Sequence, residues 1–188
     1  MKKILLIAAM AFAAVTAFAQ PKFAHVNSEE LWQLAPEADQ ARATMEASSK
    51  EANETYQAMM DEFQAKYQQY QQKGSTWTPA IRETKEQELT EIQQRIQQFG
   101  ETVQAELRQQ EQQLYAPIMQ KVRETIQKLA KEGGYIYVFD VNSILYIDEA
   151  QSVDLTPAAR TVLGIPEGRT LETLQAELAA KAQAEQAQ

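Results

Sequence analysis

The chain has 188 residues, of which 44% are hydrophobic and 23% charged, and it carries 26 acidic against 18 basic side chains. The formal net charge of −8 argues against nucleic acid or anionic lipid as a partner, because both repel an acidic protein. The chain contains no cysteine, which excludes disulfides, a lipid-modified cysteine and a cysteine nucleophile.

Residues 1–19 have the features of a secretory signal peptide. Two lysines precede an apolar run, and Ala17 and Ala19 form an A-x-A cleavage site before Gln20. The run is shorter than the about 20 residues that cross a bilayer, so a membrane anchor is the less favoured interpretation. We expect cleavage between Ala19 and Gln20, export out of the cytoplasm and no stable membrane insertion.

Residues 20–36 are expected to form a first strand and a short helix. Phe23–Val26 is a β-prone run, and Asn27 can cap a helix over Glu29–Leu34 before Pro36 interrupts the pattern.

Residues 37–132 nearly lack glycine and proline and predict a long antiparallel helical hairpin, a coiled-coil arm with its tip at residues 74–79. Spacings of three and four residues place the large side chains of the first helix on one face. Thr78 can cap the second helix, with Pro79 at its first position. The stripe of the first helix comprises Ala52, Tyr56, Met59, Phe63, Tyr67 and Tyr70.

The second helix is expected to run from Pro79 to about Lys131. Its apolar residues also recur every three or four positions, from Leu89 to Leu129. Pro117 lies inside this helix and predicts a kink, because proline removes a backbone hydrogen bond. Pro117 is a candidate hinge for the arm, and a static kink is an equally favoured alternative.

Residues 133–163 are expected to close a small β core. Tyr135–Val141 and Ile144–Ile147 predict two strands joined by a turn at Asn142-Ser143, followed by a short helix from Thr156 to Leu163. Three short strands are too few for an isolated stable sheet, which predicts completion by other copies of the chain. The candidate residues of this oligomer core are Phe23, Val26, Ile136, Val138, Ile144 and Tyr146.

Residues 164–188 predict a linker and a flexible tail. A weak helix over residues 171–184 is possible there, and a solvated tail is the favoured interpretation. The fold class is thus mainly α with a small β core, from which a helical hairpin projects.

The sequence predicts no catalytic, metal or cofactor site. His25 is the single histidine, and it lies in a predicted strand without partners for zinc. Carboxylates alternate with lysine and arginine on the predicted helices, which is typical of a solvated face. We therefore expect a protein that is not an enzyme.

The large side chains of the arm have two interpretations. Trp77 at the tip can pack on Tyr70 or Ile81, or it can be an exposed contact for an unfolded protein. The same alternative of seam packing or client contact holds for the other candidates, which are Tyr56, Met59, Met60, Phe63, Tyr67 and Tyr70.

Several short segments in this order resemble the Skp/OmpH family of periplasmic chaperones. The resemblance spans Lys22 to Leu163 and is carried by Lys22–Asn27, Leu114–Val122, Ala130–Tyr135, Val138–Asn142, Tyr146 and Val153–Thr156. It implies a homotrimer in a Gram-negative envelope, whose coiled-coil arms enclose a cavity. It also implies ATP-independent holding of unfolded outer-membrane proteins, with no cofactor.

One feature departs from this family, whose arms are cationic. Residues 37–132 carry 16 acidic and 12 basic side chains, which puts electrostatic capture of acidic clients in doubt. The alternative function is a structural or adaptor coiled-coil protein of the envelope that binds one specific folded partner.

Overall fold

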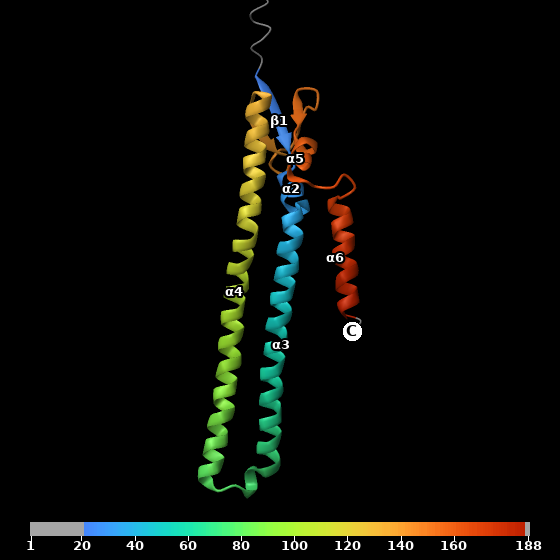
Figure 1. Cartoon of the computed structure of the whole chain (residues 1–188). Coiled ribbons are helices and arrows are strands. Elements are labelled where there is room, and N and C mark those ends of the chain that lie inside the picture. Colours follow the sequence, from blue (N-terminus) through green and yellow to red (C-terminus); the bar gives the residue numbers. More distant parts are fainter. Residues whose placement is uncertain (1–20, 187–188) are drawn as a thin grey trace, which may run out of the picture. The chain divides into compact units, whose positions relative to one another are not determined.

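The computed structural model describes residues 21–186, and the predicted signal peptide with its cleavage site at Ala19 and Gln20 lies outside them. The described chain is mainly helical with one small sheet, as the sequence predicts (Figure 1). It separates into two compact units, one of residues 39–117 and one that joins residues 21–38 to residues 118–186. The elements are β1 (Lys22–Val26), α2 (Ser28–Leu34), α3 (Pro36–Lys73), a 3-10 turn (Gly74–Thr76), α4 (Pro79–Gly133), β2 (Tyr135–Asp140), a 3-10 turn (Val141–Ser143), β3 (Ser152–Asp154), α5 (Thr156–Leu163) and α6 (Leu171–Gln186).

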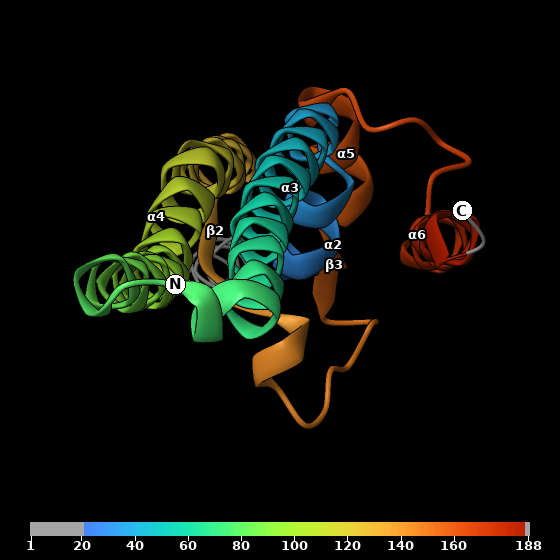
Figure 2. The same cartoon turned by 90° about the horizontal axis from the view of Figure 1, so that it is seen from below.

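Within residues 39–117, α3 and α4 run side by side as a helical hairpin (Figures 1 and 2). The hydroxyl of Thr78 accepts a hydrogen bond from the Ile81 amide at 3.4 Å, so the predicted cap at the start of α4 forms. Along the seam Ile92 is buried, whereas Phe63 and Phe99 are only half-buried. The hairpin therefore has a thin, open apolar seam instead of a core.

The sheet has the order β2-β1-β3, and both outer strands run parallel to β1. Parallel pairing of β1 with β2 requires a long crossover, which the excursion through α3 and α4 supplies. One face of β1 points into the core through Ala24 and Val26, which are 0% and 3% exposed. Because side chains alternate along a strand, Phe23 and His25 lie on the opposite face.

The predicted hairpin of two strands over residues 135–147 is wrong. Strand β2 forms, but it pairs with β1, and Ile144–Ile147 are not in a strand. A tight hairpin favours residues that reach positive φ, such as Asn-Gly, and Asn142-Ser143 lacks the glycine. The chain instead makes a 3-10 turn, in which the Asp140 carboxylate accepts a hydrogen bond from the Asn142 amide at 3.0 Å. The segment then loops out before β3 (Figure 2).

The core of the sheet-containing unit is built around α2. The side-chain oxygen of Asn27 caps this helix by accepting a hydrogen bond from the Glu30 amide at 3.0 Å. Leu31 and Leu34 face inward and are both 0% exposed. The other buried members of this cluster are Val26, Val122, Ala159, Leu163, Ile165 and Leu174.

The segment after α5 differs from the expected solvated tail at its start. Gly164 adopts the left-handed conformation that ends α5, with φ of 73°. Ile165 and Leu174 are then 6% and 4% exposed and belong to the core cluster. Helix α6 is therefore anchored at its first turn.

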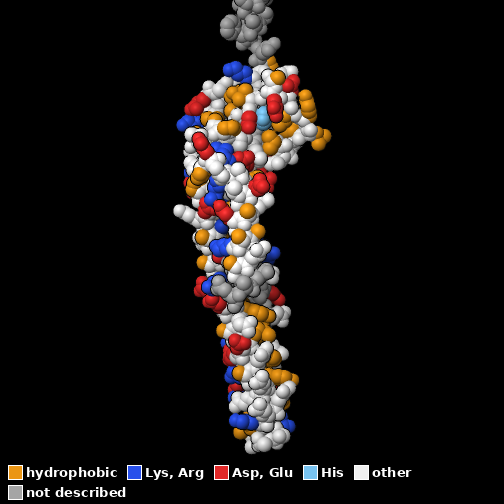
Figure 3. All heavy atoms as spheres, turned by 90° about the vertical axis from the view of Figure 1, so that its right-hand side faces the viewer, with side chains coloured by type: hydrophobic (Ala, Val, Ile, Leu, Met, Phe, Trp, Pro, Cys, Tyr) orange, Lys and Arg blue, Asp and Glu red, His pale blue; other side chains and the backbone are white. Residues whose placement is uncertain are grey.

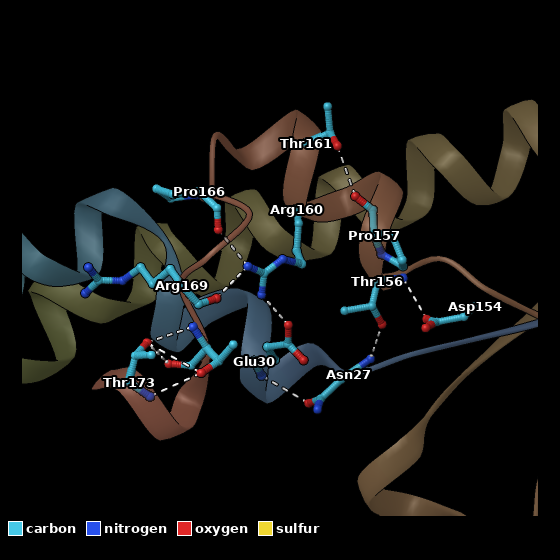
Figure 4. Close-up of polar contacts among 11 residues, drawn as sticks. Asn27, Glu30, Asp154, Thr156, Pro157, Arg160, Thr161, Pro166, Arg169 and Thr173 are labelled. Atoms are coloured by element: carbon cyan, nitrogen blue, oxygen red, sulfur yellow. Dashed lines mark hydrogen bonds and ion pairs between the residues drawn. The ribbon is translucent and has the colours of Figure 1, made fainter. Parts of the chain in front are cut away.

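Arg160 fixes this connection between α2, α5 and the segment that leads to α6 (Figure 4). Its guanidinium forms an ion pair with Glu30 of α2. It also donates hydrogen bonds to the backbone carbonyls of Pro166, at 2.8 Å, and Arg169, at 2.5 Å. One side chain thus holds three segments together.

Candidate functional site

The aromatic stripe of α3 lies on one helix face, and much of its surface remains accessible. Phe63 and Tyr67 stack with ring centroids 5.9 Å apart and an interplanar angle of 9°. Tyr56 and Tyr67 are 42% and 45% exposed, and Met59, Met60 and Phe63 are half-buried. Apolar patches alternate with polar side chains along the hairpin in the space-filling view (Figure 3).

The hairpin tip is closed by a contact between two aromatic rings. Trp77 meets Tyr70 edge-on, with ring centroids 5.9 Å apart and an interplanar angle of 65°. Packing of Trp77 onto Tyr70 is therefore confirmed, while Ile81 is 47% exposed. The hydroxyl of Tyr70 donates a hydrogen bond to Glu86 of α4, and this bond raises the pKa of Tyr70. Trp77 remains half-exposed, so packing does not hide it.

One groove of the hairpin is spanned by ion pairs between its helices. Arg95 of α4 pairs with Glu62 of α3 at 3.2 Å, and Lys66 of α3 pairs with Glu88 of α4 at 3.3 Å. Hydrogen bonds from Lys85 and Lys66 lower the pKa of Glu88. The groove around these pairs has a volume of about 420 Å³.

A second groove of the hairpin, with a volume of about 320 Å³, has a different lining. Its floor is apolar, because Phe99, Val103 and Leu107 of α4 are half-buried there. Its acidic members, Glu51 and Glu106, form no ion pair within the described part of the chain. The full lining is Ser48, Glu51, Ala52, Thr55, Phe99, Val103, Glu106, Leu107 and Gln110.

The candidate residues for self-association separate into two groups. Val26 and Val138 belong to or pack against the core, while Phe23 is half-buried and stacks on Tyr137 at 6.4 Å. Ile136 and Tyr146 are 56% and 80% exposed, and Ile144 is half-buried.

The sheet and the loop after it also expose apolar side chains that the sequence did not single out. Tyr137 and Phe139 of β2 are 60% and 44% exposed, Val153 of β3 is 49% exposed and Leu145 is fully exposed. The sheet-containing unit therefore presents an apolar surface that its own chain leaves uncovered.

His25 has a structural partner. Its Nδ1 lies 2.8 Å from Oγ of Ser152 on β3, which joins two strands of the sheet. Within residues 21–186 no group of three or more potential ligands is placed to hold a metal ion. In the same residues, no helix is long and apolar enough to cross a bilayer.

Pro117, the candidate hinge, lies inside α4 at the point where the two compact units divide. In the sheet-containing unit, Lys121 of α4 forms an ion pair with Glu37 of α3. This hydrogen bond is the main cause of the lowered pKa of Glu37. The role of Pro117 as a hinge stays a prediction.

The sequence reasoning missed the second groove. The only feature of the sequence that pointed to this groove was Ala52, a small residue in a stripe whose later members are aromatic or methionine. A small side chain at a seam position leaves room between two helices. Which acidic side chains line that room, however, cannot be read from the spacing.

The sequence of the chain matches a known protein family. The family model of OmpH-like outer membrane proteins matches residues 22–161. The chaperone protein Skp of Yersinia enterocolitica is 25% identical over 155 residues, which cover 81% of this chain and 94% of the Yersinia protein. Helix α6 lies beyond the residues that the family model matches.

A solved structure has the same fold. The crystal structure of an OmpH-like outer membrane chaperone from Caulobacter crescentus superposes with a TM-score of 0.68 at 16% sequence identity. The match covers 77% of this chain and 85% of the Caulobacter chain.

Proposed function

Since the chain belongs to the family of OmpH-like outer membrane proteins, we propose that it is a periplasmic holding chaperone that works without ATP. It binds unfolded outer-membrane proteins in a cavity between helical arms and prevents their aggregation. The observation that carries this proposal is the open seam of the hairpin, where aromatic and methionine side chains remain half-exposed.

The chemistry of the seam suits a holding function. A fully buried aromatic side chain removes about 150–250 Å² from water. A half-exposed ring keeps roughly 80 Å² for a client, worth at most about 2 kcal/mol at about 25 cal/mol per Å². Such contacts have little directionality, and flexible methionines such as Met59 and Met60 adapt to different partners. Several weak contacts hold many sequences without selecting one.

Self-association completes the site. Sheets of three short strands are marginal alone, and exposed apolar surface commonly marks an interface. Further copies of the chain cover the surface formed by Ile136, Tyr137, Phe139 and the loop with Tyr146, most simply as a homotrimer. A cavity then forms because several hairpins surround one space.

The first test is the copy number of the processed chain by light scattering. A trimer supports the cage, and a well-folded monomer at micromolar concentration contradicts it. The second test dilutes several unrelated outer-membrane proteins from urea into buffer with and without the chaperone, without nucleotide, and follows turbidity.

The expected result is suppression of aggregation for each of these proteins at a molar ratio near one oligomer per client. Protection of none, together with capture of a single folded partner, would instead indicate the adaptor function.

A further inference from the structure

The two grooves described above differ in how their carboxylates are neutralised. In the first groove, Glu62 and Glu88 are each paired with a basic side chain of the opposite helix. In the second groove, Glu51 and Glu106 stand on opposite helices, and none of the lining residues is basic. The hairpin thus supplies cations to the first groove, where only Glu91 has no ion pair within the described residues, and none to the second. A further groove, lined by Glu83, Glu86 and Glu91 of α4, also lacks a basic residue, but its other lining residues are polar and it has no apolar floor.

Neighbouring basic residues do not fill this gap. Lys50 precedes Glu51, but its Nζ lies 4.0 Å from the carboxylate of Glu54, one turn further along α3. Arg108 is exposed and does not belong to the lining of the groove. The two carboxylates therefore remain available for a cation from another molecule.

The floor of the groove selects the kind of cation. Phe99, Val103 and Leu107 are half-buried apolar side chains, and Ala52 leaves space above them. A small inorganic cation gains nothing from such a floor. Lysine and arginine side chains gain from it, because their methylene stems cover apolar surface while the charged head stays at the rim.

We propose that this groove binds lysine or arginine side chains of the unfolded client, with the stem on the apolar floor and the charge beside Glu51 and Glu106. The inference rests on the proposed holding function and adds a substrate preference to it. The arm then favours cationic or neutral segments over acidic ones, which is the reverse of capture by a cationic arm.

The test measures peptide binding to the processed full chain. The probes are three fluorescent, unstructured peptides of equal length and equal apolar content, which differ only in carrying three arginines, three glutamines or three glutamates. The expected order of affinity is arginine over glutamine over glutamate, and 0.5 M salt should reduce the difference between them because salt screens exposed charges.

The groove is tested by the double substitution Glu51→Gln and Glu106→Gln. Each contact between a carboxylate and an arginine lies near the surface and is worth about 0.2–1 kcal/mol, so loss of both should weaken binding of the arginine peptide by more than about twofold and at most about thirtyfold. The matched control, Glu83→Gln with Glu101→Gln, removes the same charge from exposed positions of α4 that do not line this groove. Its affinity should stay within about twofold of the unchanged protein.

Three results would overturn the inference: equal binding of the arginine and glutamine peptides, no loss in the groove variant, or an equal loss in the control variant. The last would indicate overall charge instead of a groove. If the protein prevents aggregation but ignores peptide charge, only this inference fails. If it prevents no aggregation at all, the holding function fails, whatever the peptides show.

Discussion

The two compact units differ in whether their apolar side chains form a packed core. In the sheet-containing unit, Leu31 and Leu34 are completely buried under β1, α4 and α5. Within residues 39–117, Ile92 is the only large apolar side chain that is buried to a similar degree. The sheet-containing unit therefore has a packed core of its own, beside the apolar surface that it exposes on β2 and the loop after it, whereas the hairpin has only a thin apolar seam.

This difference suggests that the core of one unit determines the stability of the fold, while the seam of the other is available for binding. A helix in the hairpin is held by its own backbone hydrogen bonds, by a thin seam and by exposed ion pairs that contribute little each. Local opening of such a segment costs less than unfolding a packed core. If the hairpin binds clients as proposed, it can adapt to them while the sheet-containing unit remains folded, and substitutions in the two units should have different consequences.

The largest expected effect is on stability, and it comes from a substitution in the core under α2. Leu31→Ala leaves a cavity at a site that is 0% exposed, and we expect the free energy of unfolding to fall by about 2–5 kcal/mol. Urea denaturation followed by circular dichroism measures this loss. Leu178→Ala is the control, since Leu178 is 45% exposed on α6 and should cost less than about 0.5 kcal/mol. Similar losses for both variants would mean that the core does not lie under α2.

A smaller effect is expected from Arg160, which joins α2 and α5 to the start of α6. Arg160→Gln leaves Glu30 and two backbone carbonyls without their charged donor, at a cost of about 1–3 kcal/mol. The amides of α6 should then exchange hydrogen faster, while those of the hairpin stay unchanged. The control Arg108→Gln, on the exposed face of α4, should change neither the stability nor the exchange of α6. If the amides of α6 exchange at the same rate in the Arg160 variant as in the unchanged protein, Arg160 does not anchor this helix.

The sequence predicted the hairpin well because its signals are local and repeated. Apolar spacings over more than 30 residues define each helix, and caps at Asn27 and Thr78 mark where two of them begin. The fold class followed, because two such helices joined by a short break leave few alternatives.

The sheet could not be predicted in the same way. Register between β1 and β2 pairs His25 with Phe139, more than 100 residues apart, and no local pattern encodes that choice. The adjacent β-prone run at Ile144–Ile147 indicated the wrong partner for β2. The acidic groove was also out of reach, since periodicity assigns Glu51 and Glu106 to helices but not to the same gap.

Substitutions in the aromatic stripe of the hairpin should weaken client binding, which the proposed function requires, as well as the hairpin itself. Tyr56→Ser with Tyr67→Ser removes two half-exposed rings, and the buried half of each ring contributes at most about 2 kcal/mol to the stability of the hairpin. The concentration needed to hold an unfolded membrane protein should rise roughly threefold or more. Turbidity and thermal unfolding together measure both effects. Gln68→Ser with Gln71→Ser is the polar control, and a large loss of stability without loss of holding would reverse the assignment of roles.

The smallest effect is expected from the ion pair between Glu37 and Lys121 in the sheet-containing unit. The hydrogen bond from Lys121 holds the pKa of Glu37 below its ordinary value of 4.5, so the pair stabilises the folded state at neutral pH. Both side chains are nearly half exposed, which limits the contribution to about 0.2–1 kcal/mol. Lys121→Gln should therefore lower the melting temperature slightly at pH 7. The difference from the unchanged protein should shrink as the pH falls below 4.5 and Glu37 takes up a proton. Thermal unfolding between pH 3 and 7 measures this trend, and a difference that stays constant over the range would mean that the pair contributes nothing through charge.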